Sequence, residues 1–171
     1  MSCQTDVRVY LGRHKKLFEN RLRYLKELAE TETHCRRKGT GSGIANCFMD
    51  YKEDCDEYPI FGCEFINGSE SSKKTCTNQV GSCGCIHAEF KTIHAFIIQN
   101  AECIINLDNV LYSVYSPCTS CANLISLCRI QDGSIDAVVH LIDTEHDMRG
   151  IDILRANGLL VMKVSDIQLD S

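Results

Sequence analysis

The chain has 171 residues and a formal net charge of −5, and 44% of its residues are apolar against 24% that are charged. This composition is typical of globular proteins, no apolar run is long enough to span a bilayer, and no internal repeat is present. The first residues lack the pattern of a secretory signal peptide, so the twelve cysteines fit a reducing compartment better than a secreted disulfide scaffold. We therefore expect a single domain over residues 1–171, located in the cytoplasm.

The charge is unevenly distributed along the chain. Residues 1–43 hold ten basic and five acidic side chains, whereas residues 44–171 hold eight basic and eighteen acidic ones, which gives net charges of +5 and −10. Proteins that follow a nucleic-acid backbone usually carry a basic groove around their site. The acidic second part therefore favours a small-molecule ligand and makes a nucleic-acid partner unlikely, although the basic N-terminal segment leaves it as the alternative.

The first half of the chain predicts one helix, two strands and a long loop. Apolar residues at helical spacing predict an amphipathic helix from Lys15 to Thr31 with a solvated charged face. A glycine-rich stretch over 39–43 predicts a flexible connection, and two strands are expected from Ile44 to Tyr51 and from Ile60 to Ile66. The polar stretch that follows, 67–84, is long for a compact domain, so we expect it to be either functional or poorly ordered.

The second half of the chain alternates between helices and strands. Helices are predicted over 86–99, 117–130 and 148–156, and strands over 109–116, 135–142 and 159–164. The first of these helices is apolar nearly all round, which predicts burial between layers. The strand over 135–142 is apolar almost throughout, as in strands that are buried on both faces. Asn157-Gly158 is a helix C-terminal signal.

This order of elements predicts the architecture. A strand–helix–strand–helix–strand order with right-handed crossovers places the last three strands parallel in one sheet. The two earlier strands complete a five-stranded mixed sheet with helices on both faces, so the fold class is a three-layer α/β/α structure.

Two short motifs carry metal-binding and acid–base residues. The first is His87-Ala88-Glu89 and the second is Pro117-Cys118-Thr119-Ser120-Cys121, which have the patterns H-x-E and P-C-x-x-C. A catalytic zinc ion takes three protein ligands and leaves one position for water. His87, Cys118 and Cys121 supply one imidazole and two thiolates, and the C-x-x-C spacing lets both sulfurs converge when the segment turns into a helix. We therefore predict one catalytic Zn²⁺ held by these three residues.

The glutamate of the first motif is the predicted proton carrier. Glu89 lies two residues after the ligand His87, where its carboxylate reaches a metal-bound water without binding the metal. Zinc lowers the pKa of such a water to about 7, and a carboxylate can transfer its proton to a substrate. Both motifs are predicted at helix N-termini, which stabilise anions. Together the motifs are the signature of zinc-dependent nucleobase deaminases. Either motif alone also fits a purely structural zinc site, which is the alternative.

The other cysteines raise the question of a second metal. A structural zinc site drawn from six of them is a hypothesis, although their spacings fit no standard zinc finger, and unligated thiols are the alternative. These six candidates are Cys47, Cys55, Cys63, Cys76, Cys83 and Cys85.

Residues 60–164 resemble the cytidine/deoxycytidylate deaminase superfamily, and within it the phage-type dCMP deaminases. The resemblance rests on residues 86–89, 116–121 and 152–159, the last of which reads Asp-Ile-Leu-Arg-Ala-Asn-Gly-Leu. It implies a cytidine deaminase-like fold, a homo-oligomer, and zinc-dependent hydrolytic deamination of a cytosine nucleotide, with dCMP giving dUMP and ammonia. Asn67, within the segment 63–68 that is similar to the family's sugar-binding segment, is implied to bind the deoxyribose 3′-hydroxyl. Ala88 and Ser116, in the two matching motifs, are carried over as further substrate contacts.

Three other hypotheses are compatible with the sequence. A deaminase of this kind can act on a base within tRNA or single-stranded nucleic acid, and the basic N-terminal segment over residues 1–43 would then contact the strand. A zinc-stabilised binding module without activity is less consistent with a retained Glu89. Related deamination of cytidine, guanine or another base is the third.

Overall fold

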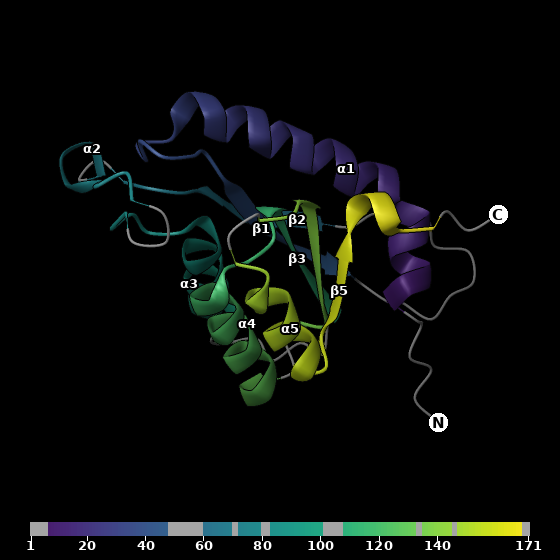
Figure 1. The fold of residues 1–171 in the computed structure, drawn as a ribbon. Coiled ribbons are helices and arrows are strands. Elements are labelled where there is room, and N and C mark those ends of the chain that lie inside the picture. Colours follow the sequence, from purple (N-terminus) through teal and green to yellow (C-terminus); the bar gives the residue numbers. More distant parts are fainter. Residues whose placement is uncertain are drawn as a thin grey trace.

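The computed structural model describes residues 7–47, 60–69, 72–79, 83–100, 108–132, 135–144 and 147–168. These residues form five strands, five α-helices and one 3-10 helix (Figure 1). In chain order the elements are α1 (Val7–Glu32), β1 (Gly41–Cys47), β2 (Ile60–Ile66), α2 (Ser72–Thr75), α3 (Ala88–Asn100), β3 (Asp108–Tyr115), α4 (Thr119–Asp132), β4 (Ala137–Ile142), α5 (Arg149–Ala156), β5 (Leu160–Lys163) and η1 (Val164–Asp166).

The strands form one mixed sheet in the order β2-β1-β3-β4-β5. Strand β1 pairs antiparallel with both β2 and β3, whereas β3, β4 and β5 are parallel to one another. The predicted five-stranded mixed sheet, with its last three strands parallel, is therefore confirmed. In the parallel part Ser113 of β3 stands beside His140 of β4, a pair that lies close to the site described below.

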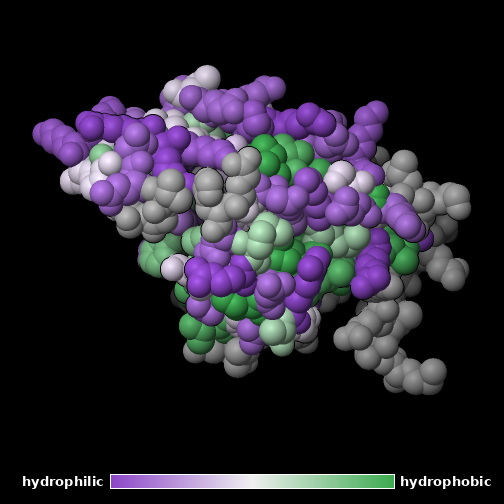
Figure 2. Space-filling view, in the orientation of Figure 1, coloured by the Kyte–Doolittle hydropathy of each residue, from purple (hydrophilic) through white to green (hydrophobic). Residues whose placement is uncertain are grey.

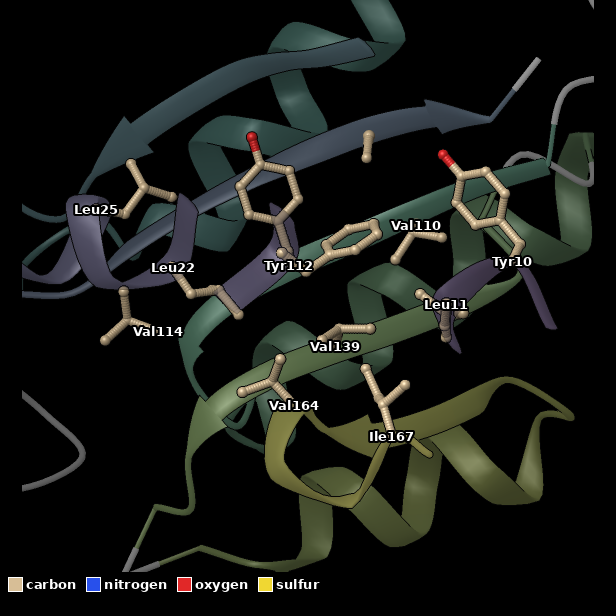
Figure 3. Close-up of a cluster of buried hydrophobic side chains, with 13 residues drawn as sticks. Tyr10, Leu11, Leu22, Leu25, Val110, Tyr112, Val114, Val139, Val164 and Ile167 are labelled. Carbon is tan, nitrogen blue, oxygen red and sulfur yellow. The ribbon is translucent and has the colours of Figure 1, made fainter. Parts of the chain in front are cut away.

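Helices cover both faces of the sheet and bury a separate core on each. On one face α1 and η1 pack on alternate residues of the strands, among them Val110, Tyr112 and Val139 (Figure 3). On the other face α3, α4 and α5 pack on the intervening residues, such as Leu111 and Val138. Because successive strand residues point to opposite faces, one strand contributes to both cores. This arrangement confirms the three-layer α/β/α class.

Helix α1 is held on the sheet by a polar contact as well as by its apolar face. The Arg21 guanidinium donates to both carboxylate oxygens of Glu64 on β2, and the hydroxyl of Tyr112 on β3 donates to the same carboxylate. Tyr112 is fully buried in the core under α1. The contact therefore fixes the helix relative to two strands.

The predicted helix over 15–31 begins eight residues too late, because α1 starts at Val7. Tyr10 and Leu11 are buried in the same core as the later residues of the helix, so the apolar face continues toward the N-terminus. Gly12 lies within this stretch and weakens the sequence pattern. The basic N-terminal segment that was expected over residues 1–43 is therefore mostly this helix.

The glycine-rich stretch was expected to be a flexible connection, but its last residues belong to β1. Ser42 and Gly43 pair with Ser113 and Tyr112 of β3, so tertiary pairing outweighs the low strand propensity of glycine. The predicted strand from Ile44 to Tyr51 is therefore shifted, and its residues beyond 47 lie outside the described part of the chain.

Helix α3 is not buried between layers as predicted. Its inner face, with Ile93 and Phe96, packs on the sheet, whereas Phe90, Ile97 and Ile98 are at least half exposed. Leu127 of α4 is exposed too. A helix that is apolar all round matches either a buried helix or one with an uncovered apolar face, so composition alone did not distinguish the two.

None of the helices in the described ranges is both long enough and apolar enough to cross a membrane.

Candidate active site

The three predicted metal ligands converge where two helices begin. His87 is the residue before α3, Cys118 is the residue before α4, and Cys121 lies in the first turn of α4. The Nδ1 atom of His87 lies 3.5 Å from Sγ of Cys118 and 3.4 Å from Sγ of Cys121. All three ligand atoms lie within 4.8 Å of one another. The predicted convergence of one imidazole and two thiols is therefore present.

Glu89 is the second residue of α3 and faces the same group of atoms. Its side chain is buried, and one carboxylate oxygen accepts a hydrogen bond of 3.3 Å from Ser113 Oγ on β3. The other oxygen, Oε2, is buried without a hydrogen-bond partner among the described residues. A buried carboxylate with an unpaired oxygen costs free energy, and such atoms are rare unless a ligand or proton reaches them.

Burial and mutual contact shift the pKa values of these groups. Burial raises the pKa of Glu89, and contact with the Cys118 sulfur raises the pKa of His87. The hydrogen bond from Cys121 lowers the pKa of Cys118 to about 4, and the same interaction, together with burial and the nearby Glu89 charge, raises the pKa of Cys121. The Glu89 charge contributes to the raised pKa values of both Cys121 and His87, as expected of a carboxylate beside these two side chains.

A family model described as the cytidine and deoxycytidylate deaminase zinc-binding region matches residues 42–136, which include both motifs. The chain belongs to this deaminase family. No curated protein matches the chain in sequence.

Solved structures share the fold of this deaminase at low sequence identity. The dCMP deaminase of cyanophage S-TIM5 in apo form is 22% identical, with a TM-score of 0.56 over 86% of this chain and 97% of that chain. The same enzyme in complex with dCMP and dUMP gives 21% identity and a TM-score of 0.60 over 86% and 96% of the two chains. The Aspergillus oryzae Rib2 deaminase in complex with DARIPP is 15% identical, with a TM-score of 0.59 over 85% and 82%.

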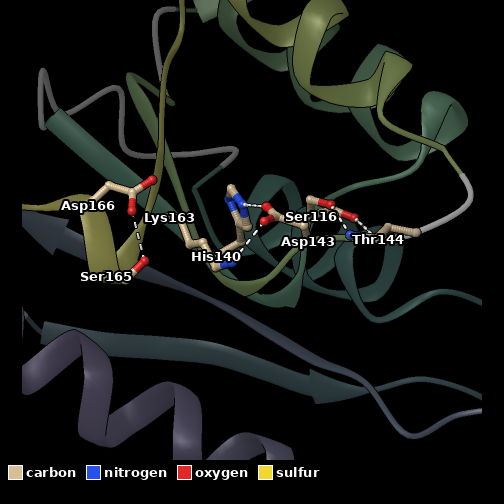
Figure 4. Close-up of polar contacts among 7 residues, drawn as sticks. All are labelled: Ser116, His140, Asp143, Thr144, Lys163, Ser165 and Asp166. Carbon is tan, nitrogen blue, oxygen red and sulfur yellow. Dashed lines mark hydrogen bonds and ion pairs between the residues drawn. The ribbon is translucent and has the colours of Figure 1, made fainter.

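The turn from Ser116 to Cys121, which carries the predicted cysteine ligands, is held by residues that follow β4. The Ser116 hydroxyl accepts a hydrogen bond of 2.8 Å from the Thr144 backbone N–H, and the Thr144 hydroxyl donates to the Ser116 carbonyl at 2.7 Å (Figure 4). Asp147 accepts bonds from the Thr119 N–H at 3.0 Å and from its hydroxyl at 2.7 Å. Thr119 lies between the two cysteine ligands, so Asp147 caps the first turn of α4.

Helix α5 approaches the same turn closely at Gly150. A Cβ atom at this position would lie 2.0 Å from the Pro117 carbonyl oxygen, which no side chain allows. Gly150, Asp147 and Thr144 therefore brace the Ser116–Cys121 turn from one segment. This brace could not be predicted from the sequence, because its residues lie about 28 positions beyond the motif and match no pattern of their own.

The three predicted substrate contacts differ in their surroundings. Ala88 is fully buried as the first residue of α3, and Ser116 is buried at the end of β3. The Asn67 amide is buried and bonded within the protein: its Oδ1 accepts from Thr33 and Thr40, and its Nδ2 donates to the Lys38 carbonyl. Substrate contact by these residues remains a prediction.

Four other cysteines form a second cluster, and its membership differs from the six candidates. Cys76, Cys83 and Cys85 meet Cys35, which the sequence analysis did not include. Cys63 lies elsewhere and donates to the Gln99 side chain. The side chain of Cys47 and all of Cys55 lie outside the described part of the chain. Cys35 lies more than forty positions before Cys76 and had no motif to mark it.

Proposed function

We propose that this deaminase catalyses the zinc-dependent hydrolysis of a cytosine nucleotide, with dCMP and water giving dUMP and ammonia. The observation that carries the proposal is the convergence of His87, Cys118 and Cys121 beside a buried carboxylate with one unpaired oxygen. A purely structural site would have no use for an unpaired, buried acid next to the ligands.

The donor set fits a catalytic zinc ion. One imidazole nitrogen and two sulfurs are three ligands of the types that zinc prefers, and three protein ligands are typical of catalytic rather than structural zinc. When bound, zinc lowers the pKa of a water molecule toward neutrality and so supplies a nucleophile. His87 and Cys118 immediately precede their helices, so the partial positive charge of both helix N-termini lies close to the ligands.

Glu89 is proposed to move the protons of the reaction. The carboxylate takes a proton from the attacking water while the water oxygen bonds to C4 of cytosine. The carboxylate then passes this proton to N3. It then takes the second proton from the new hydroxyl group and passes it to the amino nitrogen, so the C4–N bond breaks and ammonia leaves. Burial favours the protonated form of Glu89 and so assists both deliveries.

The choice of dCMP rests on two kinds of support. The cyanophage enzyme that shares the fold is a dCMP deaminase in complex with dCMP and dUMP. The net charge of −10 over residues 44–171, which hold all of the site residues, disfavours a polynucleotide backbone. A nucleic acid and DARIPP, the ligand of the Rib2 deaminase structure, are alternative substrates, and the same assay tests them.

One assay tests the proposal. The zinc-loaded chain is incubated with dCMP, deoxycytidine, dCTP, cytidine, adenosine, guanosine, DARIPP, tRNA and single-stranded DNA, and ammonia release is measured. We expect the highest kcat/KM with dCMP. A higher kcat/KM with another member of the panel would identify that compound as the substrate in place of dCMP. If the protein has one zinc bound at this site and releases ammonia from no member, the deaminase proposal is refuted.

We also propose that the protein is a homo-oligomer. Phe90, Ile97 and Leu127 leave apolar surface exposed on α3 and α4, and Figure 2 shows hydrophobic residues at the surface in the region where Figure 1 places these helices. Exposed apolar patches mark association surfaces. Light scattering after gel filtration gives the mass in solution, and a monomer at micromolar concentration would contradict this part of the proposal.

A further inference from the structure

A second group of four cysteines comes from three separate parts of the chain. Cys35 follows α1, Cys76 follows α2, and Cys83 and Cys85 precede α3. All four are free, and all are buried. Among the described residues they form a hydrophobic cluster of their own that contains no other apolar residue, separate from the two cores on the faces of the sheet.

The sulfur atoms have the spacing of a tetrahedral metal site. The Cys35 sulfur lies 4.0 Å from that of Cys76 and 3.9 Å from that of Cys83, and all four sulfurs lie within 4.8 Å of one another. Four thiolates around zinc at about 2.3 Å are about 3.8 Å apart. The observed arrangement therefore needs little adjustment to accept the ion.

The backbone around the sulfurs also suits this role. Gly84, between two of the cysteines, has φ +75°, which glycine adopts readily and which turns the chain so that Cys83 and Cys85 both face inward. The Thr77 N–H donates to the Cys83 carbonyl at 3.1 Å, which joins the two cysteine-bearing segments. The backbone N–H groups of Asn78 and Arg36 face the Cys76 sulfur and would stabilise a thiolate there.

Within the described residues, this part of the molecule has no apolar core except the thiols. Among the described residues from 67 to 86, no Leu, Ile, Val, Phe or Met is buried. Figure 1 shows α2 and its flanking segments at one end of the molecule, away from β5, and Figure 2 shows mainly hydrophilic residues on that end. Small segments without a core usually depend on disulfides or a metal for their fold.

The charge of the surroundings fits a tetrathiolate site. Zinc with four thiolates carries a net charge of −2. Arg36 follows Cys35 directly, and Lys73 and Lys74 lie in α2 just before Cys76. The Arg36 guanidinium donates to the Lys73 carbonyl at 2.6 Å, so these basic residues gather beside the cluster.

We propose that Cys35, Cys76, Cys83 and Cys85 bind a second zinc ion that has a structural role. Four cysteine ligands leave no open position, which is the pattern of structural rather than catalytic zinc. The ion would tie the segment over 67–86 to the end of α1.

The same ion would fix the approach to the catalytic ligand His87. Cys85 lies two residues before His87, and the intervening Ile86 carbonyl accepts a hydrogen bond of 2.9 Å from Gly68. On the other side, Thr33 donates to the Asn67 side chain at 2.8 Å, and the Cys35 N–H bonds to Thr33 at 3.1 Å. Hydrogen bonds through Thr33, Asn67 and Gly68 thus connect Cys35 to the segment of Cys85. This connection includes the predicted substrate contact Asn67.

The test counts zinc ions and their sulfur ligands in the full chain. Protein purified under reducing conditions from zinc-supplemented medium is expected to contain two zinc ions per chain. The double variant C118S/C121S is expected to retain one, with four sulfur neighbours at about 2.3 Å by X-ray absorption at the zinc edge. One zinc in the unmodified chain, iron in place of the second zinc, or fewer than three sulfur neighbours in the double variant would overturn the proposal.

A second variant and a control complete the experiment. Cys35→Ser is expected to lose the second zinc, whereas Cys63→Ser, a change at a cysteine outside both clusters, should keep two. Loss of zinc from Cys63→Ser equal to that from Cys35→Ser would also overturn the proposal. If Cys35→Ser fails to fold, the C118S/C121S measurement still decides. Because zinc content is measured independently of turnover, an inactive protein with two zinc ions would refute the proposed function and support the second site.

Discussion

The two oxygens of the Glu89 carboxylate have different surroundings, and this difference is the basis of its proposed role. Ser113 holds one oxygen, so the side chain has a fixed orientation, and the other is buried with no partner among the described residues. A proton-transfer group needs both properties, because it must be positioned and must also have an oxygen available to the reacting atoms. No other carboxylate named at the site combines them, since Asp147 uses its oxygens to cap α4 and to pair with Arg149.

Replacing Glu89 by Gln should abolish most turnover while leaving the metal site intact. Glutamine has the same shape and still accepts from Ser113, but it cannot carry the proton, so we expect kcat to fall by about 10²- to 10⁴-fold. Zinc content and thermal stability are measured in parallel and should stay near those of the unmodified protein. A kcat within about threefold of the original would remove Glu89 from the proton path.

At the level of single residues, the sequence predicted the groups that are proposed to perform the chemistry but not those that hold them. His87, Glu89, Cys118 and Cys121 were predicted because their types and spacing follow from the chemistry of zinc. Asp147 was missed because a capping carboxylate is defined only by the N–H that it reaches, here that of Thr119.

Among the helices, α5 shows how closely one element must approach another at the site. Gly150→Ala replaces a poor helix former by the best one, which alone would stabilise the protein by about 1 kcal/mol. The new Cβ, however, would meet the Pro117 carbonyl at 2.0 Å, and backbone cannot move aside as a side chain can. We expect the clash to dominate, with a net loss of about 1–3 kcal/mol in the free energy of unfolding and weaker zinc binding.

Gly62→Ala is the matched control for this prediction. A Cβ atom on Gly62 in β2 would have no neighbour within 4 Å. Denaturant unfolding and zinc affinity should therefore change little in Gly62→Ala. Equal effects of the two substitutions would show that the approach of α5 to Pro117 is not critical.

The contact between α1 and the sheet gives a second prediction at this scale. Glu64→Ala leaves the buried Tyr112 hydroxyl without its acceptor and the Arg21 guanidinium without its partner. The free energy of unfolding should fall by about 1–3 kcal/mol. Glu19→Ala removes an exposed i,i+4 pair with Arg23 and should cost at most about 0.5 kcal/mol by the same denaturant measurement. A ratio near one between these effects would argue against the anchoring role of Glu64.

The types of the secondary elements were predicted well, and the misses have physical causes. Strand β2 was predicted with its observed bounds, and the end of α5 was predicted from Asn157-Gly158, where Gly158 has φ +77°. The start of β1 was missed because pairing with β3 orders glycines that have no strand propensity of their own. The outward face of α3 was missed because apolar composition does not reveal whether a layer covers the helix.

Considered as a whole, the molecule should lose stability in mild acid because of a histidine buried in the sheet. His140 on β4 is buried, and its Nε2–H donates to Asp143 at 2.8 Å, while Nδ1 is buried with no hydrogen-bond partner in the described part of the chain (Figure 4). Burial lowers the pKa of His140, and Lys163 acts in the same direction, whereas Asp143 and Asp166 oppose the shift. The folded state therefore binds a proton at His140 less readily than the unfolded chain does.

The sign of the pH effect follows from this difference in proton binding. Below the ordinary histidine pKa of about 6.5 the unfolded chain takes up a proton that the folded state resists, so the free energy of unfolding should fall between about pH 7 and pH 5. His140→Gln keeps a donor for Asp143 but does not titrate, so its stability should depend less on pH over this range. Urea unfolding of both proteins at several pH values makes the comparison, and identical slopes would exclude His140 as the cause.

The overall architecture could be predicted because it depends on connectivity. The strand–helix alternation after β3 fixes parallel pairing through the handedness of crossovers, and this part was confirmed. The cysteine cluster was predicted only in part, since the convergence of Cys35 with residues some forty to fifty positions later depends on how α1 lies across the sheet. Contacts between distant segments that share no motif cannot be read from local patterns.

The limits of the family-matched stretch, residues 42–136, have a practical consequence. A gene fragment cut to these boundaries would encode every catalytic group named above. It would lack α1, which covers one face of the sheet, and it would also lack Cys35, Asp147 and Gly150. Library or domain-grafting work on this protein should therefore begin upstream of Val7 and extend beyond Ile167, because the catalytic motifs alone do not make up an independently folding unit.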